Sequence, residues 1–154
     1  MKRRTSERGQ SLVELSISLL VLLYLLSGAV EFGLAFFQFV QLRDAAQEGA
    51  LYGSMNPADL TSIESRVRGS SNSPVNMDIS ASNPVTVNIY VDNVLVQSNA
   101  TPTGAGVSAC EGHAIKVEAR FNHVVFMPFM SRIIGSTVPL NAEVTDTILS
   151  PVCP

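Results

Sequence analysis

The most constraining feature of this sequence is an uncharged run of sixteen residues, 15–30, that begins directly after Glu14. An apolar run of this kind, flanked by further apolar residues, predicts a membrane helix. A carboxylate in such a helix costs about 2.5–3.5 kcal/mol at the bilayer centre, less near the interface, and normally has a partner. Glu14 stands five residues after Gly9, and this spacing makes it a candidate for a specific contact rather than a chance interfacial acid.

The apolar stretch is longer than a membrane is thick. Residues 12–40 would form a helix of about 43 Å, against a hydrocarbon core of about 30 Å. The helical pattern then continues to about Gly53, so we expect one transmembrane and stalk helix over residues 10–53. Glu31 falls near the outer membrane boundary, where it either marks the edge of the bilayer or pairs with a basic group of another subunit. It is therefore a candidate helix-interface residue.

The distribution of charge predicts the orientation. Residues 1–9 carry a net charge of +3 and the whole chain −3, so residues 10–154 sum to −6. Basic flanks stay in the cytoplasm, and we expect a cytoplasmic leader (residues 1–9), an inner-membrane helix and an extracytoplasmic domain (residues 54–154). The acidic remainder argues against nucleic acid as a partner.

The fold class expected is α+β, with the long helix followed by a short helix and a small antiparallel sheet. Asn56 as cap and Pro57 as first helical residue predict a helix to about Arg68. Alternating apolar residues predict strands at 85–91, 94–96, 115–121 and 138–145, with a turn at 92–93 and a loop at 101–108. Residues 124–134 are apolar but contain Pro128, and we expect them to cover the sheet.

Cys110 and Cys153 both fall in the domain expected outside the cytoplasm, where oxidation is permitted. We expect a disulfide between them, because Cys153 lies on a proline-flanked tail that would otherwise fray; the alternative is two free thiols. A metal site is not expected, because a structural zinc site needs four ligands. Four potential ligands are present, namely Cys110, His113, His123 and Cys153, but the expected disulfide uses both cysteines.

The N-terminal third resembles a known family. Four features occur in a fixed order: the segment 8–14 (RGQSLVE), the apolar run, the segment 30–33 (VEFG) and the segment 45–50 (AAQEGA). In this order they resemble the TadE-like family, which comprises minor, pseudopilin-like proteins of the tight-adherence (Flp-type) pilus. The resemblance is close over about residues 8–53. Beyond that the chain is similar only in the order of its elements.

The resemblance implies cleavage between Gly9 and Gln10 by a prepilin peptidase, with Glu14 as the acid used in recognition and assembly. In type IV pilins and their relatives, such a glutamate pairs with the new N-terminal amine of another subunit. The implied partners are membrane lipid, the major Flp-type pilin, other minor pilins and the tight-adherence inner-membrane platform. Major pilins of this type carry Tyr after the glutamate and are much shorter, whereas this chain has Leu15 and a large domain. Both departures indicate a minor component.

Two readings of the N-terminus stay open beside this one. The segment is either an uncleaved signal anchor for an extracytoplasmic binding module or a secretory signal peptide with a weak site at residues 27–29. The continuation of the apolar helix beyond Glu31 disfavours the signal peptide.

Catalysis is not expected. No nucleophile elbow or comparable motif surrounds the serines and histidines, and residues 104–106 lack the context of a phosphate-binding loop. His113 and His123 are expected to be ordinary residues at the edge of the sheet. We therefore assign no catalytic residue and no cofactor, and we disfavour a periplasmic hydrolase.

Overall fold

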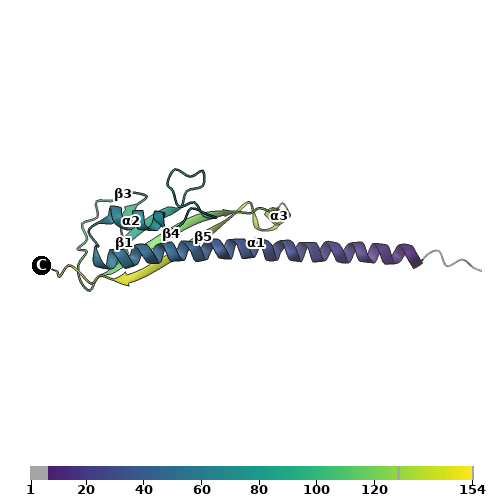
Figure 1. Ribbon diagram of the computed structural model, residues 1–154, viewed down its shortest axis with the longest axis horizontal. Helices are drawn as coiled ribbons and strands as arrows, with labels where there is room; N and C mark the ends of the chain where they lie inside the picture. Colours follow the sequence, from purple (N-terminus) through teal and green to yellow (C-terminus); the bar gives the residue numbers. More distant parts are fainter. Residues whose placement is uncertain (1–6, 128, 154) are drawn as a thin grey trace, which may run out of the picture.

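A 49-residue helix, α1 (Glu7–Met55), dominates the protein. The computed structural model describes residues 7–127 and 129–153, so the basic residues 2–4 of the expected leader and Pro128 lie outside the described residues. At 1.5 Å per residue α1 is about 73 Å long. Figure 1 shows its N-terminal half projecting as a bare rod beyond the α+β domain, which lies along the other half.

The domain contains two further helices and one sheet. The sheet is antiparallel, with the strand order β3-β2-β1-β4-β5. The α+β class and the order of the main elements are therefore as predicted. The bounds are α2 (Leu60–Gly69), β1 (Thr86–Val91), β2 (Val94–Ser98), β3 (Thr101–Pro102), β4 (Ala114–Val124), α3 (Ser131–Ile134) and β5 (Thr137–Thr147).

Two strand expectations need correction. The loop expected at 101–108 begins with the two-residue strand β3, because Gln97 and Ser98 of β2 pair with Pro102 and Thr101. The strands β4 and β5 are longer than their apolar alternation indicated, because the backbone ladder continues through polar positions to the Val124–Thr137 pair. The predicted β1–β2 turn is present, and Asp92 and Asn93 both adopt positive φ, as the tight turns of hairpins require.

The short helix starts later than its sequence suggested. Asp59, not Asn56, is the N-cap of α2, and its carboxylate accepts a hydrogen bond from Ser62 N at 3.0 Å. Asn56 instead continues the end of α1, since its N–H donates to Tyr52 O. Pro57 therefore belongs to the turn between α1 and α2 and not to the first turn of α2.

The core forms where one stripe of α1 meets α2 and the inner face of the sheet. Small and apolar residues recur along this stripe at helical spacing, and their side chains are fully buried: Leu42, Ala45, Ala46 and Ala50. Residues of α2 and of the central strands pack against them, including Ile63, Val67, Val87, Ile89, Ile115 and Val117.

Glycines in the last turns of α1 allow this close approach. A Cβ at Gly49 would lie 2.5 Å from Cγ2 of Val67 and 3.4 Å from Cγ1 of Val117, and a Cβ at Gly53 would lie 2.6 Å from Cδ1 of Ile115. The helix was expected to end at about Gly53, and it ends two residues later, at Met55. Gly53 itself is a close-packing position, because a Cβ there would meet the sheet.

This packing yields a stability prediction. Gly49→Ala should lower the free energy of unfolding by about 1–3 kcal/mol, because Val67 is buried and its branched side chain cannot move aside freely. The matched control is Gly33→Ala, since a Cβ there would meet nothing within 4 Å. Urea unfolding of the full chain in detergent micelles, followed by circular dichroism, measures both. Equal stability of the two variants would contradict the close packing at Gly49.

Candidate functional site

The N-terminal half of α1 is a continuous apolar surface that the rest of the chain leaves uncovered. Within the described part of the chain, α1 is the one helix long and apolar enough to cross a membrane, and none of its most apolar 18-residue window is buried. Large apolar side chains point outward on every side of the helix over residues 12–26. Burial of apolar surface contributes about 25 cal/mol per Å², so this surface requires lipid or other helices around it.

Gly9, Gln10 and Glu14 lie together at the start of this surface. Gln10 and Glu14 are one helical turn apart and line the same side of α1, with Gly9, Val13 and Ile17. Within the residues that the structure describes, the Glu14 carboxylate accepts no hydrogen bond and forms no ion pair. This apolar part of α1 thus presents a carboxylate that has no partner among the described residues, beside the residue expected to become the N-terminus.

The second acid of the apolar helix, Glu31, has the opposite environment. Its side chain is buried, and its carboxylate accepts three hydrogen bonds from the polypeptide that follows β4 and from β4 itself. Oε1 accepts from His123 Nε2 at 2.8 Å and from Phe126 N at 3.0 Å, and Oε2 accepts from Met127 N at 3.0 Å. Gln38, two turns further along α1, contacts the other ring nitrogen of His123 through Oε1 at 2.7 Å.

Both ring nitrogens of His123 have a partner on α1, Gln38 at Nδ1 and Glu31 at Nε2. Glu31 and His123 form a buried pair, each only 3% exposed. Additional hydrogen bonds satisfy the remaining groups, which is the condition under which a buried pair is tolerated.

Glu31 was expected to mark the membrane edge or to pair with a basic group of another subunit; its carboxylate binds its own chain, and its place relative to the membrane stays a prediction. His123 was expected to be an ordinary residue at the edge of the sheet. It lies on β4 beyond the last pair with β1, Thr86–Arg120, so only β5 flanks it there, but its side chain is buried against α1. The two residues are 92 positions apart. No local sequence pattern predicts this contact. The one indication in the sequence is that Glu31 and His123 are polar residues on otherwise apolar faces of their elements.

The connection between β4 and β5, residues 125–136 and called the tip below, also differs from expectation. It was expected to cover the sheet. The tip instead extends beyond the end of the sheet and packs on α1 (Figure 1). The Phe129 ring meets the Tyr24 ring edge to face, with centroids 5.3 Å apart, and Met130 lies against Gly28. The hydrogen bonds of Glu31 direct the tip to this position.

The two cysteines form a disulfide, with their Cα atoms 5.1 Å apart. The bridge ties the C-terminal tail to the segment before β4, and Glu111 N donates to Pro151 O beside it. His113 lies nearby, and its ligand atom and those of both cysteines fall within 4.8 Å of one another. His123 is far from this group because Glu31 holds it. His113 instead bonds to Asp92, and this hydrogen bond lowers the pKa of the Asp92 carboxyl.

The outer face of the sheet carries a polar cluster centred on Glu118. Burial raises the pKa of its carboxyl, but hydrogen bonds from Asn88, Arg120 and Tyr90 outweigh that effect and lower the pKa below its usual value. Asn88 Nδ2 and Tyr90 Oη donate at 2.9 and 3.0 Å, and Arg120 forms an ion pair at 2.7 Å. All of the acceptor capacity is used within the sheet, so the cluster serves the fold and offers no free base.

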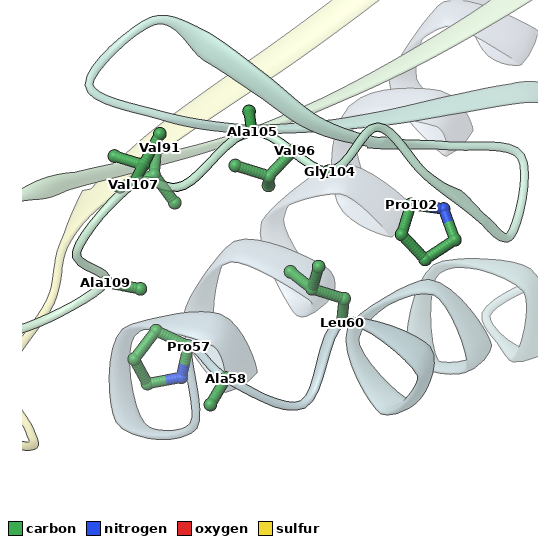
Figure 2. A pocket seen from close by; sticks show the side chains of 10 residues that line it. All are labelled: Pro57, Ala58, Leu60, Val91, Val96, Pro102, Gly104, Ala105, Val107 and Ala109. Atoms are coloured by element: carbon green, nitrogen blue, oxygen red, sulfur yellow. The ribbon is translucent and has the colours of Figure 1, made fainter.

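An open apolar cavity of about 350 Å³ lies between the start of α2 and the loop after β3. Figure 2 shows its lining side chains, which come from the α1–α2 turn, from β1 and β2, and from residues 102–109. None of the ten lining residues bears a polar or charged side chain: Pro57, Ala58, Leu60, Val91, Val96, Pro102, Gly104, Ala105, Val107 and Ala109. Acid–base chemistry needs titratable groups in reach of a substrate, and this cavity supplies none.

The fold and the bare helix together define a class: a protein whose N-terminal helix is long and apolar enough to span a membrane, with an α+β domain packed on the second half of that helix. Comparison with known families finds a match for the residues of this helix. Residues 9–51 match the family described as TadE-like protein, which confirms the resemblance seen in the sequence. The match fits a membrane-anchored, pilus-related protein. The match covers most of α1 and stops before α2 and the sheet. No curated protein and no solved structure matches the chain.

The Glu31 contacts yield a second prediction. Glu31→Ala should leave His123 and two backbone N–H groups unsatisfied, at a cost of about 1–3 kcal/mol for each buried group, and should release the tip from α1. Trypsin should then cleave after Arg132, an exposed residue of the tip, several-fold faster in detergent micelles. Glu143→Ala is the control, because that side chain is 59% exposed and 3.9 Å from Lys116. Unchanged cleavage after Arg132 would show that Glu31 does not hold the tip.

Proposed function

We propose that this protein is a minor pilin or pseudopilin of a tight-adherence (Flp-type) pilus, with a structural rather than a catalytic role. The observation that carries the proposal is the TadE-like match on a bare apolar helix. On that helix, the Glu14 carboxylate lies one turn from Gln10 and has no partner among the described residues. The protein would occupy the inner membrane, with its basic N-terminus in the cytoplasm and the acidic domain on the other side.

Processing would occur between Gly9 and Gln10. Both residues lie in the first turns of α1, and a Cβ at Gly9 would meet nothing within 4 Å. A peptidase needs an extended backbone at the bond that it cuts. Glycine weakens a helix by about 0.5–1 kcal/mol relative to alanine, so this turn opens more readily than the apolar turns that follow. Cleavage would remove the basic leader and leave a positively charged amine on Gln10.

Glu14 would then supply the attraction for assembly. The amine of a neighbouring subunit would pair with it, and the low dielectric around the apolar helix strengthens such a pair. Glu31 is occupied by its own chain and does not compete. The partners would be the prepilin peptidase, the inner-membrane platform, the major pilin and other minor pilins, with lipid around the unassembled helix.

The first experiment determines the N-terminus. Intact-mass measurement and N-terminal sequencing of the protein extracted from the membranes of its native host should give a chain that begins at Gln10. A chain that begins at Met1 would exclude prepilin-type processing. The protein would then be an uncleaved anchor that carries a binding module.

A separate prediction tests the assembly contact. Glu14→Ala should leave membrane insertion intact, because it removes a charge from an apolar helix, and should abolish recovery of the protein with the pilus machinery. Ser18→Ala is the matched control, a polar-to-alanine change one turn further along the same side of α1. Copurification with the pilus machinery after crosslinking in whole cells measures both variants. Normal recovery of the Glu14→Ala protein would disprove the pairing even if the N-terminus is Gln10.

A further inference from the structure

The tip exposes a concentration of large apolar side chains to its surroundings. Phe129 is 58% exposed and Ile133 is 71% exposed. Phe126 and Ile134 are exposed beside them. A loop that faces water normally carries polar residues at such positions. In the described part of the tip, Arg132 is the one charged residue.

The tip lies beside the part of α1 that crosses the membrane. Phe129 packs on Tyr24, which is seven residues before Glu31 and therefore about 10 Å further along the helix toward its bare end. A second contact region, a cavity of about 330 Å³, is lined by Leu20, Leu23, Tyr24 and Ser27 of α1 and by Met127 and Phe129 of the tip. The exposed apolar surface of α1 thus continues onto the tip without a polar boundary.

Most of the N–H groups in the described part of the tip are also satisfied within the protein. In lipid, an irregular segment persists only where its polar groups are satisfied within the protein. Glu31 accepts the N–H groups of Phe126 and Met127. Other N–H groups of the tip donate to carbonyls of the tip itself: Val125 to Ser136, Met130 and Ser131 to Met127, Ile133 and Ile134 to Met130, and Gly135 to Ser131.

We propose that the tip is a second membrane-binding element, inserted among the acyl chains of the leaflet on the side of the α+β domain. The apolar side chains of the tip would enter the leaflet beside α1. Arg132 forms no ion pair with the described part of the chain, and its long side chain would extend to the lipid phosphates, as basic residues do at membrane interfaces. The Glu31–His123 pair is then the internal partner that allows an irregular segment to enter lipid.

Lipid is the favoured occupant because the tip surface continues the uncovered apolar surface of α1, which lipid surrounds in the unassembled protein. With Glu31 at the membrane boundary, as the sequence predicts, the Tyr24 level lies about 10 Å deeper, which agrees with the 5–10 Å to which interfacial segments bury their apolar faces. The consequence is a fixed orientation: α1 and the tip would contact the membrane at two points, and the domain could not rotate freely about the end of a single helix.

The experiment uses the full chain in lipid vesicles. The sequence contains no tryptophan, so Phe129→Trp and Ile133→Trp each introduce a single fluorophore into the tip. Each protein is reconstituted at high lipid-to-protein ratio in phosphatidylcholine vesicles, with and without bromine on the acyl chains. Leu20→Trp on α1 is the positive control, and Leu149→Trp is the negative control, since Leu149 is 65% exposed but lies at the opposite end of the domain.

Insertion of the tip predicts that brominated lipid removes more than half of the emission of both tip fluorophores, as it does for Leu20→Trp, and leaves Leu149→Trp unchanged. Quenching by acrylamide in the water phase, with no effect of bromine, would overturn the proposal. Protection from both quenchers would overturn it as well, because protein and not lipid would then cover the tip. Insertion of the tip requires only that α1 lies in the bilayer. If bromine does not quench Leu20→Trp, the membrane position of α1 itself is refuted. If bromine quenches Leu20→Trp but not the tip fluorophores, only the insertion of the tip is refuted.

Discussion

The buried pair of Glu31 and His123 joins the two halves of this protein. A carboxylate on an apolar helix needs a partner, and here the chain supplies the His123 ring from β4 and two backbone N–H groups from the tip that follows. The contact fixes where the end of the sheet meets α1, and it brings the tip down to Tyr24. The packing of the last turns of α1 on α2 and the sheet then completes the domain.

The two glutamates of the apolar helix have different roles because they have different neighbours. Glu31 is surrounded by donors from its own chain and contributes to the fold. Glu14 lies where the described chain provides no donor, so its charge is available to another molecule. This difference is the structural basis of the assembly role proposed for Glu14. The TadE-like match spans both residues.

Much of the architecture could be predicted from local patterns. Residues 15–30 require a nonaqueous environment whatever the rest of the chain does, and alternation at 115–121 fixes a strand with one buried face. The limits of elements were less predictable. Asn56 and Pro57 form a plausible helix start, but Asp59 provides the cap because the geometry of the turn places its carboxylate at Ser62 N. Gly53 looks like a helix end in the sequence and is a close-packing position in the fold.

The sequence by itself determined that this chain has an N-terminal helix apolar enough to span a membrane, with an acid near its start, a TadE-like N-terminal segment and an α+β domain beyond it. Hydropathy, charge and short motifs are properties of contiguous residues. The tertiary structure alone decided the partner of Glu31, the burial of His123 and the position of the tip beside Tyr24. These depend on contacts between residues about 90–100 positions apart, and such contacts arise only when β4 is set against α1.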